Sequence, residues 1–250
     1  MDNQPEISVC IPAYEMGGLG GVFLSHSLDI LARQTFDRFE VIVSDQSQND
    51  DIAAICRRSD VPVRRIDARS VPRGASGSIN HAMAAARGRI VKILFQDDYL
   101  LGDDALGRIA LVFDTPSVNW CLTGSQHTRD GVSLDYHLIP RWHDQIHFGL
   151  NTVSSPSVLA MRKTPDLWFD TQLVWLMDVD FFKRCASRWG PPTLLPDPLV
   201  VNRLHGGQVS AGVSPALIRR ELRYIRDKYR SEMDWSDWLH WLGRMCRTVF

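Results

Sequence analysis

Residues 90–99 read Ile90-Val91-Lys92-Ile93-Leu94-Phe95-Gln96-Asp97-Asp98-Tyr99. The apolar run is rich in β-branched residues, so it predicts a buried strand that stops at two adjacent carboxylates, Asp97 and Asp98. In an open α/β sheet, the ligand crevice lies at the carboxyl ends of the strands. Two carboxylates there suit a divalent cation that carries phosphates, although an acidic pair alone more often simply ends a strand in a turn.

The composition bounds the class of protein. At 250 residues the chain fits one large domain or two small ones, and a net charge of -1 gives no reason to expect nucleic acid as a partner. Its five cysteines form no Cys-x-x-Cys pair, which argues against a disulfide framework and favours a cytoplasmic protein. The polar start is unlike a secretory signal, and no apolar run approaches the roughly 18 residues of a membrane span.

Strands and helices alternate over the first hundred residues. This alternation predicts an α/β fold with a parallel sheet and helices on both of its faces. Pro62 indicates that the third strand lies at an edge of the sheet. The expected strands are 7–12, 39–44, 61–66 and 90–95, and the expected helices lie within 23–34, 51–56 and 74–88.

The second half is less regular, and no linker in it requires two independent domains. We expect helices at 106–113 and 178–189, strands at 118–123 and 157–161, and a hairpin within 126–136. The Pro- and Gly-rich segment 191–212 predicts a long ordered loop, and 215–250 predicts a helical tail.

Six short motifs place polar groups beside the predicted strand and helix ends. They are residues 8–15, 39–47, 74–88, 95–98, 175–184 and 203–210. In this order they resemble the family 2 glycosyltransferases, which have the GT-A fold and transfer a sugar from a nucleotide donor with inversion. The resemblance implies a Rossmann-like, mostly parallel sheet in a domain of residues 1–212, followed by a tail of residues 213–250. Residues 1–100 would bind the nucleotide, and residues 101–212 would hold the acceptor and the catalytic base.

The resemblance also assigns donor-binding residues. They are Pro12, Ala13, Tyr14, Glu15, Asp45, Gly74, Ser76, Asn80 and Asp97. Asp45 matches a residue that contacts the nucleotide base in this family, which favours a UDP-sugar, although thymine presents the same edge. Ser44 stands where the family often has the first acid of an Asp-Asp pair.

Asp97, Asp98 and His205 match the metal-binding positions of the family. Their oxygen and nitrogen donors suit Mg²⁺ or Mn²⁺, and the sequence does not choose between these ions. Phe95 stands where the motif often has its first aspartate, so either Asp97 or Asp98 could be the direct ligand. A lone histidine such as His205 more often has a structural role, which the match to the motif offsets.

Asp178 is the expected catalytic base, and Asp180 is the reserve. Inversion requires a base that takes the proton of the acceptor hydroxyl. Two carboxylates at i and i+2 of a helix point in different directions, so only one is expected at the crevice, and Asp180 could instead pair with Arg184. Met177 replaces the glutamate that often precedes the base, and ordinary first-turn acids remain the alternative.

A second metal pattern lies outside these motifs. His143 and His147 have the i, i+4 spacing of a zinc-protease helix. Asp144 replaces the usual glutamate base, and Pro140 and Gly149 leave room for only a short helix. The hydrolase interpretation is therefore disfavoured, and a role in acceptor recognition is expected instead.

The tail combines a basic segment with a Trp-rich amphipathic one. The basic residues are Arg219, Arg220, Arg223, Arg226, Lys228 and Arg230, and the apolar ones are Trp235, Trp238, Leu239, Trp241, Leu242, Met245 and Val249. This pattern is typical of a membrane interface with anionic lipids, here through residues 231–250. A helix packed on the domain or on a second subunit of a homo-oligomer explains the pattern equally well.

The resemblance thus implies an inverting, metal-dependent glycosyltransferase. It also implies a nucleotide-sugar donor, a glycan or lipid-linked acceptor, and a role in bacterial surface polysaccharide synthesis. The expected location is the cytoplasm or the inner face of the plasma membrane. The alternative is a non-catalytic protein that binds nucleotide-sugars or serves as a scaffold and retains the fold.

Overall fold

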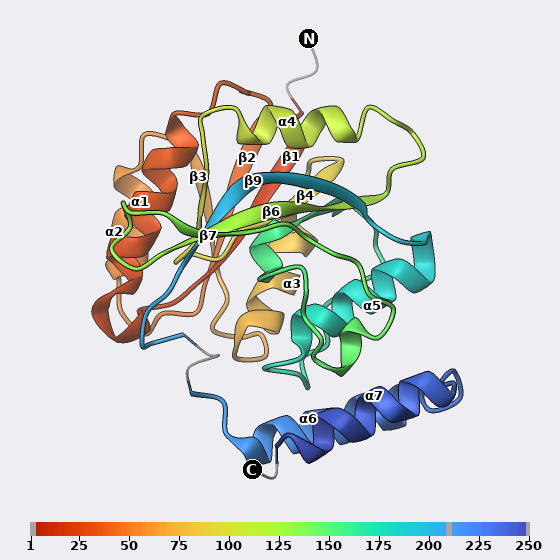
Figure 1. The fold of residues 1–250 in the computed structure, drawn as a ribbon. Coiled ribbons are helices and arrows are strands. Elements are labelled where there is room, and N and C mark those ends of the chain that lie inside the picture. Colours follow the sequence, from red (N-terminus) through yellow and green to blue (C-terminus); the bar gives the residue numbers. More distant parts are fainter. Residues whose placement is uncertain (1–3, 209–211, 249–250) are drawn as a thin grey trace.

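The structure, a computed structural model, describes residues 4–208 and 212–248. In these residues nine strands form one sheet in the order β3-β2-β1-β4-β8-β6-β9-β5, with β7 paired to β6. Helices cover the sheet, and two C-terminal helices lie beyond one end of it (Figure 1). One hydrophobic core runs through the sheet, the covering helices and this helical pair.

The first half of the sheet is parallel, as the alternation of strands and helices predicts. Its strands are β1 (Ile7–Ala13), β2 (Phe39–Asp45), β3 (Val63–Asp67) and β4 (Ile90–Ile93), and β3 lies at the edge. The connecting helices are α1 (Gly20–Ala32), α2 (Asp51–Arg58) and α3 (Ala75–Ala85), with a 3-10 turn, η1 (Met16–Gly18), before α1. β1 is buried along its whole length, which the continuous apolar sequence explains.

The second half of the sheet mixes parallel and antiparallel pairs. Its strands are β5 (Tyr99–Leu100), β6 (Trp120–Thr128), β7 (Asp135–Leu138), β8 (Leu159–Arg162) and β9 (Thr193–Arg203). β8 runs antiparallel between β4 and β6, while β9 runs parallel to β6 and antiparallel to β5. The other elements here are α4 (Ala105–Val112), α5 (Met177–Trp189), η2 (Ile146–Phe148) and η3 (Pro156–Val158).

The predicted loop 191–212 is wrong over half of its length, because β9 occupies residues 193–203. Two prolines within this strand suggested a loop, since proline lacks a ladder donor. The pairing of β9 with β6 shifts register around Gly124, where the Pro196 carbonyl leaves no room for a Cβ. This irregularity accommodates the prolines in the sheet. Residues 209–210, which end the predicted motif 203–210, lie outside the described residues.

The predicted hairpin is present, but its turn is wider than the two-residue turn that Asp130-Gly131 suggested. Residues 129–134 connect β6 to β7. The Asp130 carboxylate accepts the backbone N–H groups of Val132 and Ser133 at 2.8 and 2.7 Å, which closes the longer loop.

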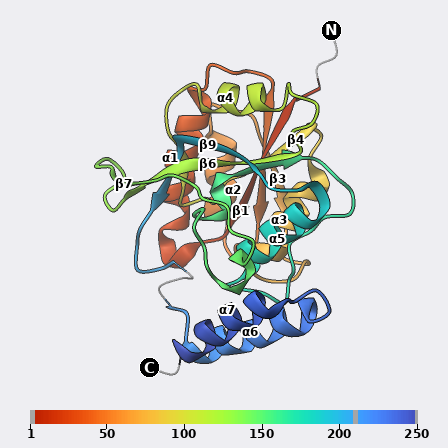
Figure 2. The same cartoon turned by 45° about the vertical axis from the view of Figure 1, so that its right-hand side comes forward.

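The tail forms two helices, α6 (Pro215–Tyr229) and α7 (Trp235–Cys246), and they lie side by side in Figures 1 and 2. Ser214 caps α6, and Asp234 with Asp237 forms a capping box at α7. Their inner residues, including Leu222 and Trp241, belong to the core shared with the sheet. Val249 and Phe250 lie outside the described residues. Among the residues that the structure covers, no helix is both long and apolar enough to cross a bilayer.

Candidate active site

A cavity of about 520 Å³ opens at the carboxyl ends of the parallel strands. It also reaches the loop before α5, so it joins the two halves of the chain. Eight predicted site residues line it: Pro12, Ala13, Tyr14, Gly74, Ser76, Asp97, Asp98 and Asp178. A crevice at this edge of the sheet is the general ligand site of open α/β folds.

Gln96 fixes the loop after β1, and the sequence did not single it out. Its Oε1 accepts the backbone N–H of Tyr14 at 2.6 Å, and its Nε2 donates to the carbonyls of Tyr14 and Gly20 at 3.0 and 3.1 Å. A Cβ at Gly20 would collide with the Tyr14 carbonyl, so the loop needs glycine there. The only sequence signal was the position of Gln96 next to Asp97.

Gln46 fixes the start of α3 by hydrogen bonds, as Gln96 fixes the loop after β1. Its Oε1 accepts the Gly74 N–H at 3.0 Å, and its Nε2 donates to the Pro72 carbonyl at 3.0 Å. Gly74 has a φ of 111°, a conformation that favours glycine. The N-terminus of α3, with Ser76, therefore faces the cavity and is suited to anionic ligand groups.

Five predicted site residues do not line the cavity: Glu15, Asp45, Asn80, Asp180 and His205. Asp45 is buried, and its carboxylate accepts Arg65 Nε at 2.7 Å and the Ser47 N–H at 2.8 Å. Asn80 exchanges two hydrogen bonds with the backbone of Phe169, at 2.7 and 2.8 Å. The Glu15 side chain accepts the N–H of Gln48 at 3.4 Å. Asp45, Asn80 and Glu15 thus support the loops around the cavity, and their roles in donor binding stay predictions.

Asp98 reaches the cavity, but hydrogen bonds occupy its carboxylate. Its Oδ2 accepts Ser155 Oγ, Ser157 Oγ and Asn202 Nδ2 at 3.1, 2.6 and 2.9 Å, and its Oδ1 accepts the Arg203 N–H at 3.1 Å. The residue is 3% exposed. Burial, and next the charge of Asp97, raise the pKa of Asp98 to about 7.

Asp97 and His205 form the more accessible pair. The Asp97 Oδ2 atom lies 3.0 Å from His205 Nε2, and the His205 ring packs against Phe23 with ring centroids 4.9 Å apart. Among the described residues, no three His, Cys, Asp or Glu side chains form a ready-made metal site. One carboxylate and one imidazole fit a cation whose remaining ligands are phosphate oxygens, as is usual for Mg²⁺.

Buried Lys92 supports Asp98 indirectly, through Ser157. Its Nζ donates to the Ser157 carbonyl, and Ser157 in turn holds Asp98 and the Phe95 N–H. Burial lowers the pKa of Lys92 to about 7. A charged residue inside a predicted strand was the available sequence signal for this role.

Asp178 lies half-buried at the cavity wall, in the first turn of α5. Its Oδ2 accepts Asn151 Nδ2 at 2.9 Å, and its Oδ1 accepts the Val179 N–H at 2.8 Å. Burial is the largest cause that raises its pKa to about 7, and the nearby charge of Glu221 adds to it. A carboxylate with this pKa is suited to accept a proton near neutral pH.

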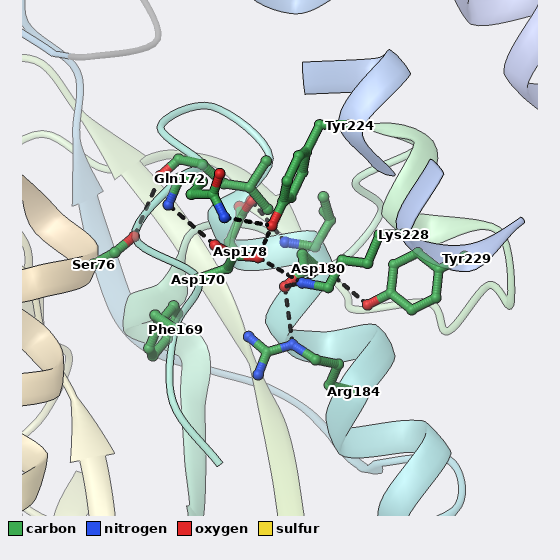
Figure 3. Close-up of polar contacts among 12 residues, drawn as sticks. Ser76, Phe169, Asp170, Gln172, Asp178, Asp180, Arg184, Tyr224, Lys228 and Tyr229 are labelled. Atoms are coloured by element: carbon green, nitrogen blue, oxygen red, sulfur yellow. Dashed lines mark hydrogen bonds and ion pairs between the residues drawn. The ribbon is translucent and has the colours of Figure 1, made fainter. Parts of the chain in front are cut away.

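Asp180 points away from the cavity into a polar network (Figure 3). Its carboxylate accepts Arg184 Nε at 2.9 Å, Lys228 Nζ at 2.8 Å and the Tyr229 hydroxyl at 2.8 Å. The pairing with Arg184 that the i, i+4 spacing indicated is therefore present. Asp178 is the carboxylate of the two that meets the cavity.

The histidine pair outside the motifs forms no metal helix. Residues 146–148 make a single 3-10 turn, and His147 is buried with its pKa lowered to about 3 by that burial. His143 Nδ1 accepts the Gln145 N–H at 3.1 Å, which is a local turn contact. These positions argue against a zinc-protease helix, and the expected role in acceptor recognition stays a prediction.

Solved structures that resemble this fold include those of two nucleotide-sugar complexes. The TarS 1-349 protein of S. aureus, in complex with UDP-GlcNAc, has a TM-score of 0.70 and 19% identity, over 98% of this chain and 71% of that one. The mannosyltransferase PcManGT of Pyrobaculum calidifontis, in complex with GDP-Man and Mn²⁺, has a TM-score of 0.65 and 18% identity, over 92% and 66% of the chains. This likeness confirms the GT-A fold.

Curated relatives and a family model complete the comparison. Uncharacterized protein MT1568 of Mycobacterium tuberculosis is 28% identical over 74% of this chain, and Uncharacterized protein y4gI of Sinorhizobium fredii is 26% identical over 75% of it. The matches span 63% and 21% of those two relatives. The model of glycosyl transferase family 2 matches residues 8–183, well over half of the chain, so this protein belongs to glycosyl transferase family 2.

Proposed function

We propose that this protein is an inverting glycosyltransferase that moves a sugar from a nucleoside-diphosphate donor to an acceptor hydroxyl. The observation that carries the proposal is one cavity lined by both Asp97 and Asp178. The first carboxylate belongs to the strand end that suits a diphosphate, and the second has a pKa of about 7. Membership of glycosyl transferase family 2 supports the same reaction class.

The chemistry follows from the two carboxylates. The acceptor oxygen forms a bond to the anomeric carbon while the bond from that carbon to the diphosphate breaks, and Asp178 takes the acceptor proton. The N-terminus of α3 is placed to offset charge on the departing diphosphate. Mg²⁺ or Mn²⁺ held by Asp97 and His205 would neutralise that charge further.

The donor proposed first is a UDP-sugar. The complex of TarS with UDP-GlcNAc supports this choice, whereas the complex of PcManGT with GDP-Man supports GDP-mannose as the alternative donor. The base contact expected of Asp45 stays a prediction, and Arg65 and Ser47 each donate one hydrogen bond to that carboxylate. Gln46 and Arg73 line the cavity nearby and are available to a donor.

The acceptor proposed is a glycan or a lipid-linked sugar in bacterial surface polysaccharide synthesis. The acceptor side of the cavity carries the apolar residues Val174, Trp175 and Leu176, which suit the faces of sugar rings. We place the protein at the inner face of the plasma membrane. The exposed apolar residues of α7, Trp235 and Leu239, support this location.

The test is a donor screen with Mn²⁺ or Mg²⁺, in which release of nucleoside diphosphate is measured from UDP-GlcNAc, UDP-glucose, UDP-galactose and GDP-mannose. We expect at least one donor to be hydrolysed slowly without acceptor, and Asp97→Ala to abolish this release. Donor binding without turnover, even when glycan acceptors are added, would instead favour the non-catalytic binding protein. Failure of every donor to bind would overturn both functions.

A further inference from the structure

Glu221 of α6 is a buried carboxylate that serves a segment far from it in sequence. It is 1% exposed. Its Oε1 accepts the Val174 N–H at 2.8 Å, and its Oε2 accepts the N–H groups of Trp175 and Leu176 at 3.0 and 2.9 Å. Hydrogen bonds to an ionised carboxylate are among the stronger ones in proteins, so this contact holds three consecutive backbone units.

These three residues form the cavity wall immediately before α5. Leu176 occupies the N-cap position of α5 and has no side-chain oxygen to cap the helix. Glu221 therefore supplies from α6 the negative charge that a local capping residue would provide at this helix end. Asp178 follows two residues later, so its direction depends on the segment that Glu221 holds.

We propose that Glu221 is the positioning residue of the catalytic base: it fixes residues 174–176 and thereby aims Asp178 into the cavity. The inference rests on the proposed function and deepens it. It also gives the tail a role in catalysis, because the carboxylate that orders the active-site wall comes from α6.

The tail also contacts other residues of the stretch 170–180, and Figure 3 shows some of these contacts. Asp170, at the start of this loop, accepts the Tyr224 hydroxyl at 2.8 Å and Lys228 Nζ at 2.7 Å. From α7, the Arg244 guanidinium lies 5.6 Å from the centre of the Trp175 ring. The two tail helices thus contact residues 170–180 on several sides, with Glu221 next to the base.

The charges around Asp178 predict a pH signature for this role. Glu221 is the charged group that raises the pKa of Asp178 after burial, while Asn151 faces it as a neutral donor. Arg220 Nη2 lies 3.7 Å from Glu221, and Asp180 in the same helix turn is paired with Arg184 and Lys228. Removal of the Glu221 charge is therefore expected to lower the pKa of Asp178.

The experiment compares Glu221→Gln and Glu221→Asp with wild type, using Asp227→Asn as a control with the same loss of charge on the exposed face of α6. For Glu221→Gln we expect kcat to fall about ten- to a hundredfold with little change in donor KM, because misplacement of a catalytic group costs rate. The acid limb of its pH profile moves to lower pH. Glu221→Asp keeps the charge but shortens the reach, so kcat falls while the acid limb stays in place.

Backbone amide exchange at residues 174–176 supplies a readout that does not need turnover. We expect slow exchange in wild type and in Asp227→Asn, and fast exchange in Glu221→Gln, with the fold retained by circular dichroism. Wild-type exchange, kcat and pH profile in Glu221→Gln would overturn the inference. A wild type without turnover on any donor, but with the expected exchange pattern, would contradict the proposed function and leave Glu221 with a purely structural role. If Glu221→Gln fails to fold, the Glu221→Asp comparison decides by the same two readouts.

Discussion

At the scale of single residues, the two adjacent carboxylates of residues 90–99 have different tasks. Asp98 accepts four hydrogen bonds in the protein interior, whereas among the described residues the Asp97 side chain has a hydrogen-bond partner only in His205. Asp97→Asn is therefore expected to weaken Mn²⁺-dependent binding of UDP at least tenfold and to leave thermal stability close to wild type. Isothermal titration with UDP and Mn²⁺ measures the first effect, and thermal unfolding measures the second.

Asp98→Asn is the matched comparison. In Asp98→Asn, the new side-chain NH₂ group faces at least one of the donor groups of Ser155, Ser157 and Asn202, so a hydrogen bond is lost. We therefore expect a loss of about 1–3 kcal/mol in the free energy of unfolding. Equal effects of the two substitutions on both measurements would contradict the division of roles. The sequence could not make this distinction, because the serines and Asn202 that hold Asp98 come from distant segments.

The pKa of Asp178 predicts how the rate depends on pH. The base works only when it is ionised, and its pKa is raised to about 7. Below that value the ionised fraction falls tenfold per pH unit, so kcat at pH 5 is expected to be about a hundredfold below its plateau. Initial rates from pH 5 to 9 at saturating metal and donor measure this limb. A rate that stays flat down to pH 5 would contradict a base with a pKa of about 7.

At the scale of elements, the contact between α5 and α6 is polar and depends on the positive charge of Lys228. Lys228 lies between the half-buried carboxylate of Asp170 and the buried carboxylate of Asp180, 2.7 and 2.8 Å away. Lys228→Met leaves these charges short of a partner, and we expect a loss of about 3–5 kcal/mol in the free energy of unfolding. Urea unfolding checks this value, with Arg230→Met, at an exposed position directly after the same helix, as the control. A loss no larger than that of the control would rule out a structural role for the pair of contacts.

The elements that sequence patterns predicted well are those whose signal is local. Apolar runs placed the strands of the parallel half, and Pro62 placed β3 at the edge of the sheet. β9 was missed because Pro196 and Pro198 argue locally against a strand, while its pairing with β6 and β5 is a long-range effect. Asp178 and Asp180 could not be ranked securely, since Lys228 and Tyr229, which hold Asp180, lie almost fifty residues away.

At the scale of the whole molecule, the tail belongs to the same core as the sheet. Trp241 is buried and donates to the Leu222 carbonyl at 2.8 Å, so this tryptophan is not available to a membrane. The division at residue 212 stays a prediction, but the shared core and the Glu221 contacts tie α6 to the first domain. The amphipathic pattern predicted helices here and left open which face packs on protein.

Three apolar residues of α7 remain exposed on one stripe: Trp235 at 77%, Leu239 at 53% and Leu242 at 48%. If this stripe contacts lipid, the double variant Trp235→Ser/Leu239→Ser is expected to lose most of its sedimentation with anionic vesicles. Val132→Ser, which removes an apolar side chain that is 83% exposed on the β6–β7 turn, is the control and keeps binding. Unchanged sedimentation of the double variant would eliminate α7 as the membrane contact.

The transfer reaction of Asp178→Asn tests the proposed glycosyltransferase activity most directly. Asparagine keeps the shape of the residue but cannot accept the proton, so kcat is expected to fall about a hundred- to ten-thousandfold. Binding of the active donor with Mn²⁺, measured by titration calorimetry, stays within about twofold of wild type, because the donor is held by the other side of the cavity. Transfer at the wild-type rate by Asp178→Asn would contradict the assignment of this carboxylate as the base of a glycosyltransferase.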